Sequence, residues 1–485
     1  MRLSDLTGSN GGAAQVEISG LSADSRQVKP GFLFAALAGV KQKGADFIDD
    51  AISHGAVAIL AQPGLELDRQ RAFVIADQNP RRRLALMAAK FYERQPSKIV
   101  AVTGTNGKSS VVDFTRQIWE SLGQPSASLG TLGIKSSDFE TKPSLTTPDP
   151  VEIHAALREL VDQKIDHLAL EASSHGLEQY RLDGVHLSAA AFTNLSRDHL
   201  DYHGSVEDYF HAKLRLFGEL LPTGSTAVIN RQTVYYDRIV DLCWARGIKV
   251  LSVGPQEGES ADLSWRVQEH GAGHQVLDVS YGSQHWTVDL ALIGDFQASN
   301  ALVAAALVIA SGGDAGAAIQ ALGALQSVPG RMSMAGQHHN GATIYVDYAH
   351  TPDALKTVLQ ALRPHAAGAL NVVFGCGGDR DAGKRPMMGE VAQKYADGVI
   401  VTDDNPRNED PSAIRHAIMT ACPNATEVPD RGAAIRQSIA NLQVGDLLVI
   451  AGKGHETGQI IGDQLQPFDD TQVAVDALAE LGGTQ

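Results

Sequence analysis

The sequence is poor in cysteine and in long apolar runs, and both shortages argue against whole classes of protein. Three cysteines stand among 485 residues, Cys243, Cys376 and Cys422, with no CxxC spacing. This pattern argues against a disulfide framework and a structural zinc site, and it fits a reducing compartment. The longest aliphatic run, 301–310, is about half of the roughly 20 residues that a membrane helix needs. The first residues also lack the basic and apolar regions of a signal peptide, so we expect a cytoplasmic protein.

The chain also lacks the excess of positive charge that polyanion binding requires. Its formal net charge is -16, with a pI near 5.5. Such a protein repels nucleic acids and anionic membranes overall, although a sum of charges says nothing about a local basic pocket for a small anion. Hydrophobic residues make up 43% and charged residues 20%, an ordinary globular balance, and the length suggests two to four domains.

Strand-like runs divide the chain into three blocks, 1–90, 91–329 and 330–485. The first contains short runs at 56–61 and 72–76 and ends in a helix that Asn79 can cap. In the third, runs at 343–347, 371–374, 398–402 and 446–451 alternate with helical patterns. Strand–helix alternation predicts an α/β fold with a parallel, doubly wound sheet. The polar clusters GGDRDAGKR, DDNPR and GKGHE follow strand ends, the edge where such sheets bind ligands.

The second block opens with a phosphate-loop pattern. A β-branched strand at 99–103 leads directly into a glycine loop and then a helical pattern. Glycines allow backbone N–H groups to face phosphate oxygens at a helix N-terminus. Val102 replaces the first glycine of the common motif, yet the context still favours a nucleotide site over an ordinary turn. The candidate ATP-binding residues here are Gly104, Thr105, Asn106, Gly107, Lys108, Ser109 and Ser110.

Three further residues, Glu171, His199 and Lys213, are candidate metal ligands, although each also has an ordinary structural explanation. Glu171 ends an apolar strand and, with the Ser109 hydroxyl, suits Mg²⁺. His199 follows a strand in a polar loop, where a histidine is more often not a ligand. Lys213 lies on the apolar stripe of a helix at 206–217. There it either extends its ammonium past the stripe or is a neutral amine that reacts with CO₂ to form a carbamate.

Several long motifs in the expected order resemble the Mur ligase family over about residues 20–470. They are TGTNGKSS, LEASSHGLEQYR, FTNLSRDHLDYHG, GDFQASN, VDYAHTPDAL, FGCGGDRDAGKRP, TDDNPR and AGKGHE. The resemblance implies three α/β domains: a small N-terminal UDP-binding domain, a central ATPase with a parallel sheet, and a C-terminal Rossmann-like domain for the amino acid. It implies Lys108, Lys213, His199 and Glu171 as catalytic residues. It also implies Mg²⁺ held by Ser109, Glu171, His199 and a carbamate on Lys213, and ATP contacts from Asn300, Arg331 and Asp347.

For the nucleotide-sugar substrate, UDP-MurNAc-L-Ala-D-Glu, the resemblance implies six contacts: Ser25, Thr146, Thr147, Ser173, Gln179 and Arg181. The sequence departs from the family pattern at one place in the N-terminal block. The segment 39–44, GVKQKG, lacks the His-Gln pair with which some relatives contact the nucleotide. This departure puts individual uridine contacts in question and leaves the substrate class unchanged.

The added amino acid depends on the third block. The planar fork of Arg407 suits a carboxylate, and meso-diaminopimelate differs from lysine by one carboxylate. Without the family, the DNPR segment indicates only a turn with a surface arginine. The resemblance implies that Arg380, Asp404, Asn405, Pro406, Arg407, Gly452 and Glu456 bind meso-diaminopimelate.

The predicted activity is ATP-dependent ligation of meso-diaminopimelate to the D-Glu γ-carboxylate, through an acyl phosphate, in peptidoglycan synthesis. We expect a monomer whose partners are its three small-molecule substrates. Three alternatives are a lysine-adding ligase, a folylpolyglutamate synthase relative and a nucleotide-binding regulator without catalysis. The arginine of DNPR argues against the first, the complete N-terminal block against the second, and the joint presence of Lys108, Glu171, His199 and Lys213 against the third.

Overall fold

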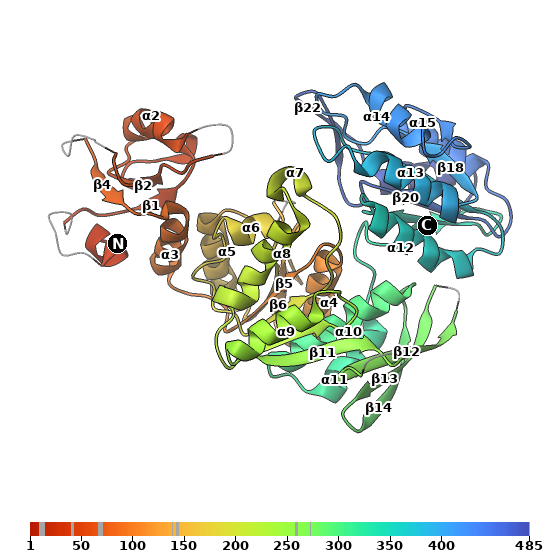
Figure 1. Cartoon of the computed structure of the whole chain (residues 1–485), viewed down its shortest axis with the longest axis horizontal. Helices are drawn as coiled ribbons and strands as arrows, with labels where there is room; N and C mark the ends of the chain where they lie inside the picture. Colours follow the sequence, from red (N-terminus) through yellow and green to blue (C-terminus); the bar gives the residue numbers. More distant parts are fainter. Residues whose placement is uncertain are drawn as a thin grey trace.

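The computed structural model describes residues 1–8, 15–39, 43–65, 71–137, 139–141, 145–257, 260–271 and 273–484. Three main sheets follow one another along the chain, each accompanied by helices, which confirms the predicted α/β class (Figure 1). Every strand of these three sheets lies within one of the ranges 1–90, 91–329 and 330–485. We propose these ranges as the domains. Figure 1 shows the N-terminal and C-terminal sheets on opposite sides of the central one.

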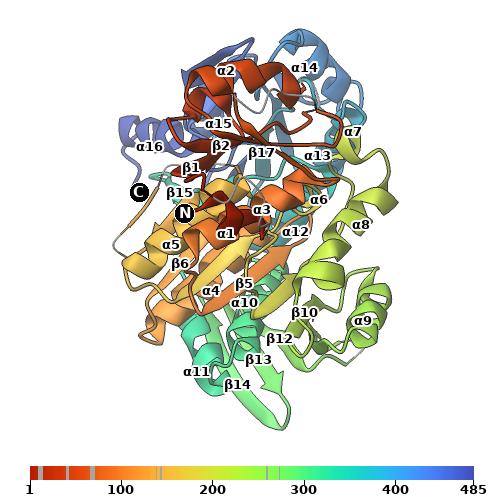
Figure 2. The same cartoon turned by 90° about the vertical axis from the view of Figure 1, so that its left-hand side faces the viewer.

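The N-terminal sheet is parallel, in the order β1-β2-β3-β4. Its last helix begins as predicted, because the Asn79 side chain accepts a hydrogen bond from the Arg82 amide at 3.1 Å and Pro80 occupies the first turn. That helix also packs against α5 (Pro150–Asp162) of the central domain, and Figure 2 shows the two helices next to one another. The elements are α1 (Leu3–Thr7), β1 (Gly20–Ser22), η1 (Ser25–Gln27), β2 (Phe32–Ala35), η2 (Gly44–Phe47), α2 (Ile48–Ser53), β3 (Ala58–Ala61), β4 (Phe73–Ala76) and α3 (Pro80–Tyr92).

The central sheet has the order β14-β13-β12-β11-β10-β9-β5-β8-β6-β7, parallel from β12 to β6 with antiparallel strands at both edges. Its elements are β5 (Lys98–Thr103), α4 (Lys108–Ser121), β6 (Ser126–Gly130), β7 (Gly133–Ser136), α5 (Pro150–Asp162), β8 (His167–Glu171), α6 (Ser174–Glu178), β9 (Ala189–Phe192), α7 (Leu200–His203), α8 (Val206–Arg215), η3 (Leu216–Leu220), β10 (Thr226–Asn230), α9 (Tyr236–Ala245), β11 (Lys249–Pro255), β12 (Leu263–His270), β13 (Gln275–Tyr281), β14 (Gln284–Leu290), α10 (Asp295–Ala310), α11 (Ala315–Gln320) and η4 (Ala321–Ala324).

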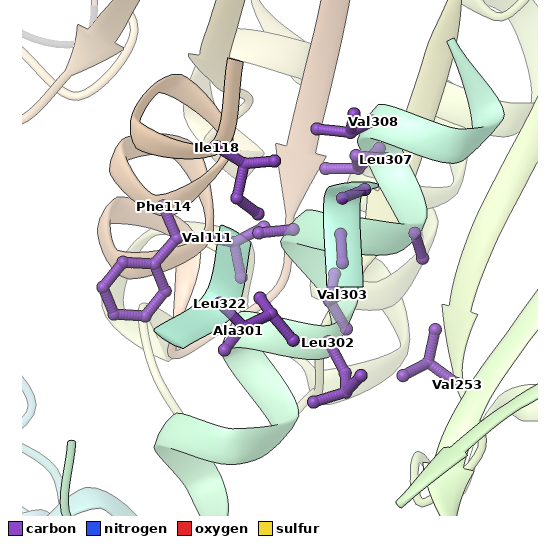
Figure 3. Packing of buried hydrophobic residues seen from close by; sticks show 14 of the residues in the cluster. Val111, Phe114, Ile118, Val253, Ala301, Leu302, Val303, Leu307, Val308 and Leu322 are labelled. Atoms are coloured by element: carbon purple, nitrogen blue, oxygen red, sulfur yellow. The ribbon is translucent and has the colours of Figure 1, made fainter. Parts of the chain in front are cut away.

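The central core explains the aliphatic run at 301–310. This run forms most of α10, which packs against α4, and Figure 3 shows side chains of the two helices, Ile118 and Leu307 among them, pointing toward one another. A helix that is apolar all round belongs inside a large core. Across the described residues, no helix combines the length and apolar character needed to cross a membrane.

The C-terminal sheet has the order β15-β16-β20-β17-β18-β19 and is parallel except for β15. The loops after β17, β18 and β20 carry the three polar clusters, as predicted, and these strands are neighbours in the sheet. The elements are β15 (Ser333–Gln337), β16 (Thr343–Asp347), α12 (Pro352–Leu362), η5 (Arg363–His365), β17 (Leu370–Phe374), α13 (Lys384–Tyr395), β18 (Gly398–Val401), α14 (Pro411–Met419), β19 (Thr426–Glu427), α15 (Arg431–Ala440), β20 (Leu447–Ala451), a separate hairpin of β21 (Gly458–Ile461) and β22 (Gln464–Pro467), and α16 (Asp470–Glu480).

Candidate active site

A cavity of about 610 Å³ lies between the central and C-terminal domains. The central domain contributes the glycine loop before α4, and the C-terminal domain contributes residues 347–350, which begin with the last residue of β16. Nearly all predicted ATP-binding residues line it; the exception is Gly104. Those that do are Thr105, Asn106, Gly107, Lys108, Ser109, Ser110, Asn300, Arg331 and Asp347.

The glycine loop requires its glycines. Gly104 and Gly107 have φ values of 145° and 87°, the region that residues with a Cβ rarely adopt. A Cβ on Gly107 would also lie 2.5 Å from Asn300 Oδ1. Lys108 Nζ donates to the carbonyl oxygens of Gly104 and Thr105 at 2.9 and 2.7 Å, so its ammonium lies over the loop. Burial lowers the pKa of Lys108.

Ser109 and Glu171 are in direct contact, as a shared magnesium site requires. Ser109 Oγ donates to Glu171 Oε1 at 2.9 Å, and the Thr131 amide donates to the same oxygen at 2.9 Å. Gly130 leaves space for this carboxylate, since a Cβ there would lie 2.2 Å from Oε1. Within the described ranges, no group of three or more His, Cys, Asp or Glu side chains is arranged to hold a metal ion by itself. A hydroxyl and one carboxylate nevertheless fit Mg²⁺, which takes its remaining ligands from phosphates and water.

Lys213 is buried on α8, with 1% of its surface exposed. Its Nζ donates to the Gly104 carbonyl at 2.7 Å and lies 4.4 Å from the centre of the Tyr209 ring. Burial, with the nearby Lys108 cation, holds the pKa of Lys213 well below its ordinary value. The predicted position on a buried face is confirmed, and extension of the ammonium into solvent is ruled out. Val206, the first residue of the predicted helix, is 37% exposed.

His199 lines the same cavity, next to Asp198. It has a left-handed φ of 53°, and its Nε2 lies 3.4 Å from Asp198 Oδ2. Burial lowers the pKa of His199 to about 3, and the Lys108 cation adds to the effect. The ring is therefore neutral at pH 7, the state in which imidazole binds a metal. The C-terminal domain reaches the same loop, because His350 Nε2 lies 3.8 Å from Asp198 Oδ2.

At the domain junction, Arg331 and Asp347 are fixed by well-defined partners. Arg331 Nη2 donates to Ser109 Oγ at 3.0 Å, so this residue bridges from the C-terminal domain to the phosphate loop. Its guanidinium also lies 4.3 Å from the centre of the Tyr348 ring. Asp347 accepts hydrogen bonds from the amides of Met332 and Ala349 at 2.6 and 2.8 Å, and burial raises its pKa to about 6. Asp198 and Tyr348, which also line the cavity, were not predicted as site residues. Asp198 lies in the motif FTNLSRDHLDYHG and Tyr348 in VDYAHTPDAL, and these motifs were the available signal.

Most of the predicted nucleotide-sugar contacts form one hydrogen-bonded group beside Glu171. Thr147 Oγ1 donates to the Glu171 carbonyl at 2.8 Å and accepts from the Ser173 amide at 2.9 Å. Arg181 donates to the Thr147 carbonyl at 2.6 Å and to Gln179 Oε1 at 2.8 Å. Thr146 hydrogen-bonds Thr131 at 3.0 Å.

Ser25 belongs to a different domain from this group. It begins η1 in the N-terminal domain and is 6% exposed, and its carbonyl lies 3.1 Å from His54 Nδ1. The departure at Val40-Lys41 lies outside the described residues.

The predicted amino-acid contacts gather at the ends of β17, β18 and β20. Arg407, with a φ of 52°, donates to the carbonyls of Gly378 and Asn405 at 2.8 and 3.4 Å. Burial, with the neighbouring Arg380, lowers the pKa of Arg407. Arg380 itself is exposed and donates to the Asp379 carbonyl at 3.2 Å. Pro406 is buried beside them, and its carbonyl leaves no space for a Cβ on Gly378.

The other members of this set, Asp404, Asn405, Gly452 and Glu456, contact one another in two pairs. Asn405 Nδ2 donates to Glu456 Oε2 at 2.9 Å, and Asp404 Oδ1 accepts from the Asn405 amide at 2.7 Å. Gly452 has a φ of 115°, and a Cβ there would lie 2.8 Å from Asp404 Oδ2. Sequence reasoning missed Lys453, which is fully buried between Asn405 and Glu456. Its place in the quoted motif AGKGHE was the available signal.

The fold and site define a class: a three-domain, nucleotide-binding ligase whose phosphate loop faces a Rossmann-like domain across a cavity. Three family models match the chain: "Mur ligase family, catalytic domain" at 17–92, "Mur ligase middle domain" at 102–308 and "Mur ligase, glutamate ligase domain" at 330–454. The chain belongs to the Mur ligase family.

Individual relatives and solved structures show which members of the family this chain is similar to. The UDP-N-acetylmuramoyl-L-alanyl-D-glutamate–2,6-diaminopimelate ligase of Bradyrhizobium diazoefficiens is 52% identical over 485 residues, which cover 99% of each chain. A solved structure of a ligase of the same name aligns over 100% of both chains with a TM-score of 0.72 and 32% identity. The MurF ligase of Thermotoga maritima in complex with ADP aligns over 96% of this chain and 97% of its own with a TM-score of 0.62. At 19% identity this is a likeness of fold alone.

Proposed function

We propose that this chain catalyses ATP-dependent amide-bond formation between meso-diaminopimelate and the D-Glu γ-carboxylate of UDP-MurNAc-L-Ala-D-Glu. The observation that carries the proposal is the cavity in which the phosphate loop faces the C-terminal domain, whose neighbouring strand ends hold Arg407. Relatives that share about half of the sequence over nearly its whole length carry the name of this activity. This is a step of peptidoglycan synthesis, and we place it in the cytoplasm, with the enzyme as a monomer.

The first chemical step transfers the γ-phosphoryl group of ATP to the substrate carboxylate. The attacking carboxylate and the phosphates are both anionic, so the site must position them and neutralise charge. The Lys108 ammonium lies on the glycine loop, and Arg331 reaches Ser109 from the facing domain. Mg²⁺ held by Ser109 and Glu171 would supply the remaining charge neutralisation. The group formed by Thr147, Gln179 and Arg181 would hold the dipeptide beside Glu171.

In the second step, the neutral amine of the amino acid attacks the acyl phosphate and phosphate departs. The N–C bond forms as the C–O bond to phosphate breaks, and the amine loses a proton. Asn405, Arg407 and Glu456 would orient the amino acid from the C-terminal domain. Because the two substrates bind to different domains, closure has to exclude water from the acyl phosphate before the amine attacks.

Lys213 would enter this chemistry as a carbamate. Its burial and lowered pKa favour the neutral amine, which attacks CO₂ and loses one proton, turning a potential cation into an anionic metal ligand. We expect Lys213→Ala to lose most activity and bicarbonate to stimulate the parent protein after CO₂ is removed. Near-normal activity of the variant, with no response to bicarbonate in either protein, would rule the carbamate out.

Arg407 would choose the amino acid. The second carboxylate of meso-diaminopimelate can pair with its guanidinium, whereas L-lysine would leave that half-buried cation unpaired. A site built to pair a polar group rejects analogues that lack the partner strongly. Two alternative activities have to be tested against this proposal: addition of L-lysine instead of meso-diaminopimelate, and the reaction of a folylpolyglutamate synthase.

ADP release tests the proposal directly. The purified protein is supplied with ATP, Mg²⁺ and UDP-MurNAc-L-Ala-D-Glu, with either meso-diaminopimelate or L-lysine. We expect release with the first and little with the second. Release with lysine alone would keep the ligase reaction and overturn the role of Arg407. Release with neither amino acid would refute the proposed function and favour the folate-type reaction or a non-catalytic nucleotide-binding role.

A further inference from the structure

Lys453 is a buried cation that the proposed reaction does not yet use. It directly follows β20 and Gly452, and none of its surface is exposed. Its Nζ donates to Asn405 Oδ1 at 2.9 Å and to Glu456 Oε2 at 3.0 Å. Lysine is almost never fully buried unless it is paired. Both partners are predicted contacts of the amino-acid substrate, so Lys453 supports two side chains that would bind that substrate.

The contact with Asn405 fixes the orientation of the Asn405 amide. Asn405 Oδ1 accepts from Lys453 and also from the Ile460 backbone amide at 2.9 Å. Because both donors contact Oδ1, the Asn405 Nδ2 group faces away from them and donates to Glu456 Oε2 at 2.9 Å. Without Lys453, one of the two donors that determine this orientation is lost.

The contact with Glu456 leaves its two carboxylate oxygens unequal. Oε2 receives hydrogen bonds from both Lys453 and Asn405, whereas Oε1 has the Tyr348 hydroxyl at 3.5 Å. Oε1 is therefore the oxygen with accepting capacity left for a ligand ammonium. Charge-assisted hydrogen bonds of the kind that hold Oε2 are the stronger ones in proteins.

Lys453 also changes the charge balance of the pocket. Asp404 and Glu456 place two carboxylates on one side, and Lys453 is the cation between Glu456 and Asn405. Although burial raises the pKa of Asp404, Lys453 and Arg431 outweigh this effect and keep the pKa below its ordinary value. Without Lys453, Glu456 would lose its paired cation, and the added negative charge would disfavour a substrate that carries two carboxylates itself.

We propose that Lys453 is a positioning and specificity-determining residue for the amino-acid substrate. It holds Asn405 and Glu456 so that one carboxylate oxygen faces the substrate ammonium, and it compensates the negative charge that would otherwise disfavour a dicarboxylic amino acid. This inference rests on the proposed ligase function and deepens it.

Steady-state kinetics of Lys453→Met test the inference in the full-length protein, with ADP release followed while each of the three substrates is varied. We expect the KM for meso-diaminopimelate to rise by about tenfold or more, the size of losing a hydrogen bond to a charged group. The KM values for ATP and the UDP-linked dipeptide should stay within about twofold. The ratio of kcat/KM for meso-diaminopimelate to that for L-lysine should fall. Lys453→Arg, which keeps the charge, should recover part of both.

Arg415→Met is the matched control. Arg415 is a nearly buried cation of the same domain, with a side chain 9% exposed, and it pairs with Asp403 and with Glu427 at 2.7 Å. It contacts neither Asn405 nor Glu456 in the described hydrogen bonds and ion pairs. We expect Arg415→Met to lower the melting temperature while it leaves the substrate KM values and the selectivity ratio near those of the parent.

The outcomes separate this inference from the proposed function. A parent protein without amino-acid-dependent ADP release would refute the function itself. An active parent, with Lys453→Met showing an unchanged KM and selectivity ratio, would overturn the role of Lys453 alone. Equal changes in all three KM values for Lys453→Met and Arg415→Met would also overturn it, as a loss of structure. If Lys453→Met does not fold, the test uses Lys453→Arg, whose longer planar head should still lower the selectivity ratio in part. An unchanged ratio in Lys453→Arg would then overturn the role of Lys453.

Discussion

Reversing the charge of Arg197 should weaken productive closure of the active site. Arg197 lies two residues before His199, and Asp381 directly follows Arg380 in the loop after β17. Arg197 Nε lies 3.1 Å from Asp381 Oδ2, and Nη2 lies 3.4 Å from Oδ1, so the pair joins the metal-site loop to the amino-acid loop. We expect Arg197→Asp to lower kcat/KM for the amino acid more than for ATP.

The exposure of the pair sets the magnitude. The Arg197 and Asp381 side chains are 47% and 16% exposed, so solvent screens their attraction. Pairs of this kind contribute about 0.2–1 kcal/mol. Reversal replaces the attraction with a repulsion of similar size, so the total is about 0.4–2 kcal/mol, a factor of about 2–30 in kcat/KM. The effect should shrink at high salt, because added ions screen both charges.

The assay compares four proteins by ADP release: the parent, Arg197→Asp, Asp381→Arg and the double variant with exchanged charges. Exchange should restore most of the activity, because the attraction is re-formed. The pair of Arg266 and Asp278 is a control at similar exposure, 54% and 20%, and its 3.2 Å contact lies within one hairpin. Failure of the exchanged pair to recover, or an equal loss on reversal of Arg266, would refute the reasoning.

Three further results are expected. Gly130→Ala should lower activity by about tenfold or more, since its Cβ would lie 2.2 Å from Glu171 Oε1 and relief of such a clash costs about 1–3 kcal/mol; full activity would show that Glu171 can move freely. Arg407→Lys keeps the charge but loses the planar fork, so selectivity for meso-diaminopimelate over lysine, measured as a kcat/KM ratio, should fall about tenfold; an unchanged ratio would contradict its role. Burial raises the pKa of Asp347 from 3.8 to about 6, so the folded protein retains a proton that the unfolded chain releases between these two pH values. The contribution of Asp347 to the free energy of unfolding therefore declines by about 3 kcal/mol as the pH rises from 3.8 to about 6. Asp347→Asn should lack the decline, and melting temperatures of parent and variant that stay parallel between about pH 4 and pH 7 would contradict it.

The parts of the site that the sequence predicted are those in which neighbours along the chain interact. The strand at 99–103, the turn at Gly104 and Gly107 and the helix that follows act within a few residues of one another, and the structure has β5, the loop and α4 in that order. The capping of α3 by Asn79 is equally local. Helical spacing placed Lys213 on the apolar face of its helix, and the structure buries it, although Val206 at the start of the same helix is 37% exposed.

The parts that the sequence did not predict depend on contacts between distant segments. Arg331 hydrogen-bonds Ser109, 222 residues away, and Lys453 meets Asn405, 48 residues away. No local pattern encodes either distance. The antiparallel edge formed by β12, β13 and β14 was also missed, and its strands carry weaker apolar patterns because they are only partly buried. For Asn405 and Arg331, the resemblance to a family supplied the residues but not the contacts that they make.

A net charge of -16 is compatible with anionic substrates because of how the cations of the site are held. Lys108 donates to backbone carbonyls, and so does Arg407, whereas Arg331 donates to the Ser109 hydroxyl. These acceptors are uncharged, so they fix the side chains without cancelling the charge that a phosphate or carboxylate would meet. Structural cations differ: Arg431 is fully buried against the Asp470 carboxylate at 2.7 Å. The charge of a hydrogen-bond acceptor, which composition cannot reveal, thus separates a cation available to a ligand from one that serves the fold.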